Sequence, residues 1–330
     1  MQALTIVDKQ LVVADRPTPR PGPGEVLVRV QGAGLNRADL AQRAGGYPAP
    51  PGVPGDIPGL EFAGVVEALG TDAPGVAIDD RVFGVVAGGA QAEYVVVHAS
   101  HCAPVPAAFD LVTAGAIPEA FVTAHDALVT IAHVAANEWV LIHAVGSGVG
   151  TTALQLAKAL GACVVGTART QAKLDRCRDL GLDHGIVPPT NDADAVDTDA
   201  LAWSILEATD GGAHVTIDLV GGPYLAANIA AAANKGRIVC IGAVAGANAT
   251  VSSASILAKQ LRITGTLLRP RDTAEKADAT AAFVRDVVPL LTSGRVAPIV
   301  DAVIPLANAE QAYDLLRSDA TFGKVVLDCS

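Results

Sequence analysis

Three glycines with helix-entry spacing are the residues best suited to chemistry in this chain. Gly146, Gly148 and Gly150 follow the apolar run 139–144 and precede an amphipathic segment over 150–160. Glycine lets the backbone turn sharply and approach a phosphate, and a helix N-terminus offers free N–H groups and a positive dipole end. Because the turn lies in a repeated strand–helix series, it predicts dinucleotide binding. The spacing is not a strict G-x-G-x-x-G, and no Gly-Lys-Ser/Thr follows to make a P-loop.

Ser147, inside this turn, is rejected as a hydrolase nucleophile. A nucleophile elbow needs glycine two residues on either side of the serine. Val145 and Val149 occupy those two places.

The end of the next apolar run, 162–167, bears on which nicotinamide cofactor is bound. NAD preference usually rests on an Asp or Glu there that holds the ribose 2′-hydroxyl. Residues 166–170 contain no acid but do contain Arg169, and Lys173 lies one helical turn further on. Two cations can neutralise a 2′-phosphate, so NADP is favoured. The alternative is a solvated helix start with incidental positive charge.

Two kinds of pattern divide the chain. Short strands are expected at 25–30, 62–70, 80–84 and 92–97, separated by Gly and Pro, which suggests a partly closed β-barrel. From about residue 120, apolar strands (139–144, 162–167, 214–219, 237–242) alternate with helices (150–160, 171–180), the signature of a parallel sheet. Helices over 274–291 and 308–317 and a strand at 324–327 then return to mixed character. The predicted class is α/β, with a β-rich domain interrupted by a nucleotide-binding domain.

Composition excludes several kinds of protein. The 330 residues have a net charge of −11 and no Lys/Arg run, so nucleic acid is not an expected partner. No apolar stretch approaches the ~18 residues of a membrane span, and the first residues do not form a secretory signal. The five cysteines are odd in number and scattered, which indicates free thiols in a reducing compartment. A cytoplasmic protein is expected.

His98, His101 and Cys102 are the only tight group of potential metal ligands in the sequence. They follow an expected strand in a loop before Pro104. No metal site is predicted there or elsewhere.

Six spaced motifs resemble the quinone oxidoreductase branch of the medium-chain dehydrogenase/reductase superfamily, with details closest to the stress-inducible quinone reductases and ζ-crystallin a more distant relative. The motifs lie at 34–40, 45–48, 59–64, 117–120, 141–150 and 266–271, in the family's order. The resemblance implies a GroES-like catalytic domain of residues 1–120 and 260–330, and an NADP-binding Rossmann domain of residues 121–259. It also implies a homodimer in which 262–268 is an edge strand between subunits.

The resemblance implies zinc-independent chemistry. Zinc alcohol dehydrogenases of this superfamily have Cys where this chain has Asn36 and His where it has Leu60. Neither an amide nor a leucine replaces a thiolate or an imidazole as a Zn²⁺ ligand. Without a Lewis acid, reduction of an electron-poor acceptor is expected rather than alcohol oxidation.

The resemblance also assigns roles to residues. Asn36, as a hydrogen-bond donor near the nicotinamide, and Tyr47, on a Gly/Pro-flanked loop, are the expected catalytic residues; the alternatives are a turn Asn and a loop-anchoring Tyr. Both are also expected to contact the cofactor, together with Thr123, Gly146, Ser147, Gly148, Val149, Thr167, Arg169, Lys173, Gly221, Gly242, Ala243, Val244, Leu267, Leu268 and Lys324. One departure is Pro188, which stands where relatives commonly have a Tyr near the 2′-phosphate, so more of the NADP preference depends on Arg169 and Lys173.

The expected activity is NADPH-dependent reduction of a quinone or similar activated acceptor. A close alternative is an enoyl-thioester or enone reductase, for which Tyr47 is an available proton donor. A more distant alternative is a non-enzymatic role, either crystallin-like or RNA-binding.

Overall fold

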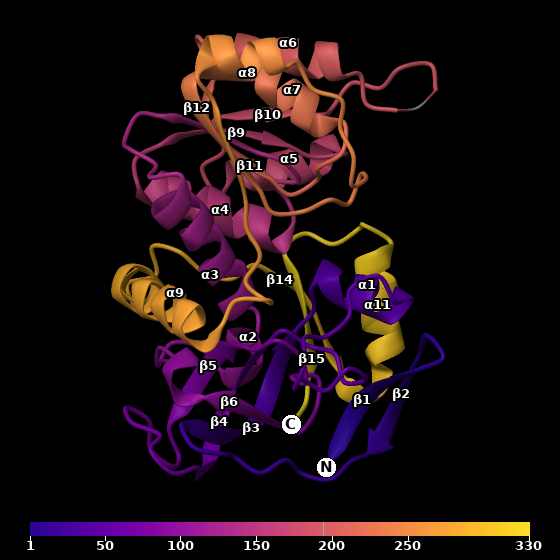
Figure 1. The fold of residues 1–330 in the computed structure, drawn as a ribbon, viewed down its shortest axis with the longest axis vertical. Helices are drawn as coiled ribbons and strands as arrows, with labels where there is room; N and C mark the ends of the chain where they lie inside the picture. The colour runs from indigo at the N-terminus through magenta and orange to yellow at the C-terminus, as the bar shows by residue number, and fades with distance from the viewer. Residues whose placement is uncertain (194) are drawn as a thin grey trace. The chain divides into compact units, whose positions relative to one another are not determined.

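The computed structural model describes residues 1–193 and 195–330 (Figure 1). The chain forms two compact units. One unit consists of Met1–Val122 and Leu268–Ser330, and the other consists of Thr123–Leu267. The chain therefore leaves the first unit once and returns to it after completing the second.

The Thr123–Leu267 unit is built on a parallel six-stranded sheet in the order β10-β9-β8-β11-β12-β13. Its strands are β8 (Trp139–Ile142), β9 (Cys163–Thr167), β10 (His184–Ile186), β11 (Ala213–Asp218), β12 (Ala232–Cys240) and β13 (Arg262–Gly265). In chain order, β8, β9 and β10 take successive places toward one edge of the sheet, and β11, β12 and β13 take successive places toward the other edge. This confirms the predicted doubly wound Rossmann architecture, in which ligands bind outside the carboxyl ends of the strands.

Helices alternate with these strands. They are α4 (Gly148–Ala159), α5 (Gln171–Arg178), α6 (Thr198–Ala208), α7 (Tyr224–Ala231) and α8 (Ser253–Lys259). Leu141 and Val165 of the sheet pack against Leu201 and Ile205 of α6 in one buried cluster. Burial of these branched side chains is the main force that holds helix to sheet. Along the chain, α3 (Pro118–His125) and a π-helical turn, Asp126–Ile131, lead into this unit.

The other unit contains the GroES-like fold, a seven-stranded sheet in the order β14-β15-β3-β4-β5-β7 with β6 also paired to β3. Its strands are β3 (Glu25–Gly34), β4 (Glu61–Leu69), β5 (Arg81–Val85), β6 (Tyr94–His98), β7 (Cys102–Pro104), β14 (Val300–Pro305) and β15 (Lys324–Asp328). A separate hairpin joins β1 (Gln2–Val7) and β2 (Gln10–Asp15). Because β3 pairs with β6 through its first half and with β15 through its last residues, the sheet bends around β3.

The helices that accompany this sheet are α1 (Arg37–Ala44), α2 (Leu111–Ala114), α9 (Thr273–Asp286), α10 (Val288–Thr292) and α11 (Ala309–Arg317), with 3₁₀ turns at Ala99–His101 and Leu306–Asn308. The single helix expected over 274–291 is wrong, because α9 ends before Val287 and α10 begins anew with Pro289 in its first turn. Proline has no N–H to donate and its ring clashes with the carbonyl four residues earlier, so a continuous helix is interrupted there.

The boundary expected between residues 259 and 260 would assign β13 to the GroES-like domain, but β13 belongs to the Thr123–Leu267 unit. It pairs in parallel with β12, so its residues complete the Rossmann sheet and the chain returns to the first unit only at Leu268. Strand pairing decides this, and the spacing of apolar residues does not reveal it. Within the described residues, no helix is both long and apolar enough to cross a membrane.

Candidate active site

The glycine-rich turn joins β8 to α4 as predicted from its residues. Ala144 adopts a left-handed conformation (φ 48°), which reverses the chain after the strand. A Cβ at Gly150 would lie 2.3 Å from the Ala144 carbonyl oxygen, so only glycine allows the helix to start this close to the strand. This is the close helix–strand packing that dinucleotide-binding turns require.

Ser147 is the N-cap of α4. Its Oγ accepts a hydrogen bond from the Gly150 N–H at 3.1 Å, which gives the hydroxyl a structural role. Among the described residues, none accepts a hydrogen bond from the N–H groups of Gly148 or Val149. Two free N–H groups at the positive end of a helix of 12 residues fit a pyrophosphate.

A buried polar network lies at the carboxyl ends of three adjacent strands. His143, just after β8, contacts Thr167 Oγ1 through Nδ1 (2.9 Å) and Asn228 Oδ1 through Nε2 (2.6 Å). Asn228 Nδ2 donates to Asp218 Oδ2 at 2.9 Å, and the other Asp218 oxygen accepts from the N–H of Gly221 at 2.8 Å. Because the Asn228 amide donates to Asp218, its oxygen must accept from His143 Nε2.

This arrangement fixes the direction of the hydrogen bonds. Burial lowers the pKa of His143, opposed by the Asp218 charge and the Asn228 hydrogen bond, so the ring is neutral and its Nδ1 accepts from the Thr167 hydroxyl. The Thr167 side chain, expected to meet the cofactor, is thus oriented by His143. No pattern in the sequence marked Asn228 as part of this edge.

The remaining predicted contacts of this unit lie at strand ends or on α3. Gly221 has φ 67°, and a Cβ at Gly242 would lie 2.4 Å from the Leu219 carbonyl oxygen. Ala243 and Val244 follow as exposed residues, Thr123 is buried on α3, and Leu267 is half exposed whereas Leu268 is buried in the other unit.

Arg169 lies exposed just after β9, and Lys173 lies in the first turn of α5. Burial raises the pKa of Tyr224, and the positive charge of Arg169 opposes that rise, which places the phenol near the guanidinium. The Tyr224 ring also packs edge-on against His143, 4.9 Å between centroids. Tyr224 of α7, and not the residue at the position of Pro188, is therefore an aromatic residue within electrostatic range of Arg169.

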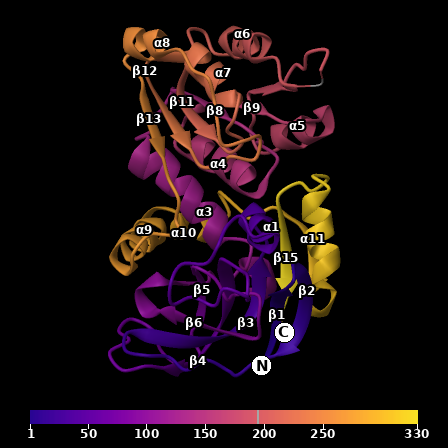
Figure 2. The ribbon, with the colours of Figure 1, turned by 45° about the vertical axis from the view of Figure 1, so that its right-hand side comes forward.

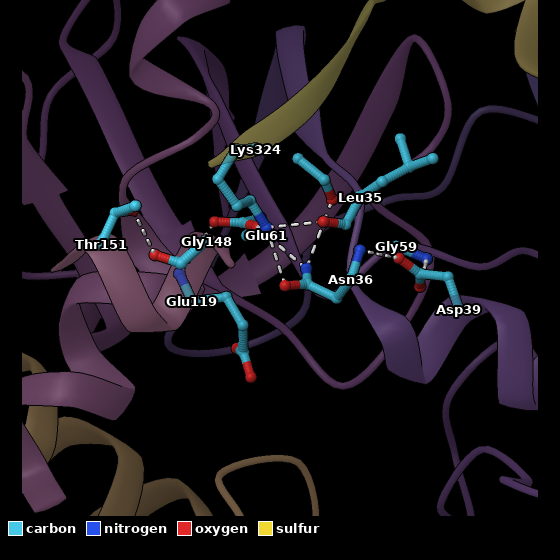
Figure 3. Close-up of polar contacts among 10 residues, drawn as sticks. Leu35, Asn36, Asp39, Gly59, Glu61, Glu119, Gly148, Thr151 and Lys324 are labelled. Carbon is cyan, nitrogen blue, oxygen red and sulfur yellow. Dashed lines mark hydrogen bonds and ion pairs between the residues drawn. The ribbon is translucent and has the colours of Figure 1, made fainter. Parts of the chain in front are cut away.

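In the first unit, Asn36 and Lys324 come together around Glu61 (Figure 3). The Lys324 ammonium donates to Leu35 O (2.6 Å), Asn36 Oδ1 (2.7 Å) and Glu61 Oε1 (2.5 Å). Asn36 Nδ2 donates to the same Glu61 oxygen at 2.8 Å. All three protons of Lys324 are therefore engaged, and both ends of the Asn36 amide have fixed partners.

Glu61 is fully buried and connects this cluster to α3. Its second oxygen, Oε2, accepts the backbone N–H of Glu119 at 2.9 Å, in the first turn of the helix. The carboxylate thus satisfies one of the free donors at a helix N-terminus while it pairs with Lys324.

Tyr47 is held by Arg269. The guanidinium lies 4.6 Å from the centre of the Tyr47 ring and donates to the Tyr47 carbonyl oxygen at 2.9 Å. It also donates to Ala87 O at 2.7 Å and Gln42 Oε1 at 2.6 Å, and Arg269 is only 4% exposed. Burial raises the pKa of the Tyr47 phenol, partly opposed by Arg269, so the hydroxyl is a proton-bearing group at neutral pH.

Two further carboxyls of this unit have raised pKa values. Burial raises the pKa of Asp39 to about 6, although the backbone N–H groups of Asn36 and Gly59 favour its charged form. Burial, followed by repulsion from Glu61, raises the pKa of Glu119 to about 8. Carboxyl groups with raised pKa values in one cluster make this cluster a candidate functional site.

His98 and His101 lie close together, with ring centroids 5.4 Å apart, and His101 Nε2 contacts the Thr273 carbonyl oxygen at 3.0 Å. Burial raises the pKa of the Cys102 thiol to about 12. Across the part of the chain that the structure describes, no group of three or more His, Cys, Asp or Glu side chains is arranged to hold a metal ion.

Two domain families match this chain. The alcohol dehydrogenase GroES-like domain matches residues 22–107, and the zinc-binding dehydrogenase family matches residues 148–285. The quinone oxidoreductase of Lama guanicoe is 30% identical over 317 residues, which are 95% of this chain and 92% of that protein. The chain belongs to the quinone oxidoreductase branch of the medium-chain dehydrogenase/reductase superfamily. It is a nicotinamide-dependent oxidoreductase.

A solved structure and a further curated protein extend this similarity. The quinone oxidoreductase from Thermus thermophilus, solved also in complex with NADPH, has a TM-score of 0.81 and 30% identity over 99% of this chain and 100% of its own. The NorB protein of the spectinabilin polyketide synthase system of Streptomyces orinoci is 32% identical over 306 residues. This chain covers 13% of that protein's length.

Several residues of this quinone oxidoreductase-like site were not singled out by sequence reasoning. Glu61, Glu119 and Arg269 all lay within the motifs that carried the family resemblance, but no role was assigned to them. The available signal was a charged residue flanked by apolar ones in a segment that must be buried. Such a residue needs a partner, and the sequence does not say which.

Proposed function

We propose that this oxidoreductase transfers a hydride from NADPH to a quinone or similar activated acceptor without the help of zinc. The observation that carries the proposal is the Lys324 ammonium, which donates to both Asn36 Oδ1 and Glu61 Oε1. Asn36 stands where zinc-dependent relatives have a cysteine ligand. A lysine that already occupies these two oxygens supports a site in which no metal bridges them.

The cofactor, when bound, supplies the hydride. The residues of the Thr123–Leu267 unit that bind it in this proposal are the N–H groups of Gly148 and Val149 for the pyrophosphate, and Arg169 with Lys173 for the 2′-phosphate. Gly146, Ser147, Thr167, Gly221, Gly242, Ala243 and Val244 complete the cofactor surface of that unit.

The other unit orients the acceptor. Tyr47, held by Arg269 and protonated at neutral pH, provides a hydrogen-bond donor. Asn36 is proposed to act near the reacting atoms, although the amide that was expected to donate freely is held by Glu61 and Lys324. Such chemistry asks the protein mainly for orientation and exclusion of water.

Steady-state kinetics with NADPH and NADH over a panel of quinones test the proposal. NADPH is expected to give the higher kcat/KM, and the double variant Arg169→Gln/Lys173→Gln is expected to lose roughly 10- to 100-fold of that advantage, the scale of one or two hydrogen bonds to a charged group. Arg176→Gln, on the same helix α5, is the matched control. Faster turnover with NADH, or a preference unchanged in the double variant, would overturn the NADP assignment.

Metal analysis of the active protein tests zinc independence. Stoichiometric zinc that a chelator removes together with the activity would contradict zinc independence.

An enone or enoyl-thioester reductase is the second candidate. The similarity to a segment of a polyketide synthase favours it, because polyketide chains are built as thioesters. The two are separated by comparing kcat/KM for trans-2-enoyl-CoA with that for quinones in one preparation.

A homodimer is proposed through β13. This strand lies at the edge of its sheet (Figure 2). All four of its residues are exposed, and the side chains of Ile263 in β13 and Leu257 in α8 leave apolar surface uncovered. An exposed edge strand is a template for pairing with a second copy. Light scattering should give twice the chain mass, and Ile263→Asp should shift it toward the monomer.

A further inference from the structure

Three carboxyls lie in the catalytic unit around Lys324, and their hydrogen-bond partners differ. Glu61 accepts from Asn36 Nδ2, Lys324 Nζ and a backbone N–H. Asp39 accepts two backbone N–H groups, from Asn36 at 2.8 Å and Gly59 at 3.2 Å. Among the described residues, none donates a hydrogen bond to the Glu119 carboxyl. Only Glu119 therefore lacks hydrogen bonds that would stabilise its charged form.

The surrounding charges also oppose ionisation of Glu119. Glu61 of β4 and Asp39 of α1 repel its negative form, whereas Lys324 of β15 and Lys276 of α9 favour it. Burial and the carboxylate of Glu61 prevail, and they raise the pKa of Glu119 to about 8. At neutral pH this side chain is mainly a carboxylic acid that holds one transferable proton.

Glu119 is placed where that proton can be used. It lies in the first turn of α3, is partly exposed, and its carboxyl points away from the contacts between Lys324, Glu61 and Asn36 (Figure 3). When ionised, Glu119 would raise the pKa of both the Tyr47 phenol and the Arg269 guanidinium, so the carboxyl lies within electrostatic range of the residues proposed to orient the acceptor. Partial exposure gives solvent a route to return the proton after each turnover.

We propose that Glu119 is the proton donor of the reduction, an inference that rests on the proposed function. The acceptor gains a hydride, that is two electrons and one proton, as NADPH becomes NADP⁺. The O–H bond of Glu119 then breaks and its proton passes to the oxyanion of the reduced acceptor, which becomes a hydroquinone. The Glu119 carboxylate takes a proton back from water. Glu61 remains paired with Lys324 throughout, and burial, aided by repulsion from Glu61, favours the protonated form of Glu119.

The test is the pH dependence of kcat in the wild type, Glu119→Gln and Glu119→Asp. The glutamine preserves size but has no acidic proton, so kcat at pH 7 is expected to fall roughly 100-fold, the lower end of what a general acid contributes. The wild-type profile should fall above about pH 8, and Glu119→Gln should lack this alkaline limb. Glu119→Asp, which restores an acid on a shorter side chain, should recover part of the rate together with an alkaline limb.

Glu67→Gln is the matched control, because it is an exposed glutamate on the same strand as Glu61 and should leave kcat and its pH profile unchanged. A wild type that turns over quinones, with an alkaline limb that persists in Glu119→Gln, would overturn the assignment of Glu119 alone. A wild type that oxidises NADPH with neither quinones nor enones would overturn both the assignment and the proposed function. NADPH binding by Glu119→Gln should match that of the wild type, which separates loss of the donor from loss of the fold.

Discussion

The Lys324 ammonium lies 2.5 Å from Glu61 Oε1, although the two residues are 263 positions apart in the chain. Lys324 begins β15 and Glu61 begins β4, and both side chains are almost completely buried. A buried pair of this kind is stable only when its remaining donors and acceptors are satisfied, as Asn36, Leu35 and the Glu119 N–H satisfy them here. The pair links the end of the chain to the proposed acceptor site.

Lys324→Met should lower the free energy of unfolding by about 3–5 kcal/mol, because it leaves the Glu61 charge buried without its cation. Urea denaturation followed by circular dichroism measures the loss. Lys158→Met, which removes a partly exposed pair with Asp183, is the control and should cost less than about 1 kcal/mol. In the double variant Lys324→Met/Glu61→Gln, part of the stability should return. Equal losses for the Lys324 and Lys158 variants would contradict this view of the cluster.

Gly150→Ala should weaken NADPH binding and lower stability together. The added Cβ would meet the backbone carbonyl of Ala144 at 2.3 Å, and a backbone atom cannot move aside by changing rotamer. A cost of about 1–3 kcal/mol is expected, as for other overpacked sites. Thermal unfolding and a fluorescence titration with NADPH report the two effects. Gly55→Ala, where a Cβ meets open space, should change neither.

Arg269→Lys should reduce kcat/KM for the acceptor roughly tenfold, the effect of losing one hydrogen bond in the site. Lysine keeps the charge but cannot reach the carbonyls of Tyr47 and Ala87 and the amide of Gln42 at once. The KM for NADPH should change less than that of the acceptor, because Arg269 is not among the residues proposed to bind the two phosphate groups of the cofactor. If kcat and KM for the acceptor match those of the wild type and only the free energy of unfolding falls, Arg269 has a structural role alone. Arg285→Lys, on an exposed ion pair, serves as the control.

The stability of the wild type and of Glu119→Gln should diverge with pH. The pKa of Glu119 rises from 4.5 to about 8 on folding, so between these values the folded state binds more protons than the unfolded state. The contribution of Glu119 to stability is therefore complete below about pH 4.5 and is lost as the pH rises through 8. Glutamine does not titrate, so the free energy of unfolding of the variant should gain on that of the wild type across this window and stay parallel above it. Asp39, whose pKa rises to about 6, gives both proteins the same slope at lower pH. Urea titrations from pH 5 to 9 check this, and parallel curves throughout would show that Glu119 ionises normally.

The local parts of the site were predictable because their chemistry is contained in a few consecutive residues. The glycine turn at 146–150 needs only a strand before it and a helix after it, and the periodicity on each side predicted both. The alternation of strands and helices likewise predicted the parallel sheet. The break between α9 and α10 was also predictable from a local residue, Pro289, because proline interrupts a helix wherever it stands in the interior. The expectation of one helix over 274–291 overlooked it.

Tertiary structure decided which charged residues share a site. The sequence by itself determined the glycine-rich turn between strand and helix, the Rossmann series and the family, because each follows from short-range spacing and turn chemistry. Only the folded chain decided that Lys324 neutralises Glu61, that Arg269 holds Tyr47, and that Glu119 is left without a donor and keeps its proton. Burial sets the energetic cost of a charge, and the partner that offsets this cost is brought from a distant segment by strand pairing, which residue spacing does not reveal.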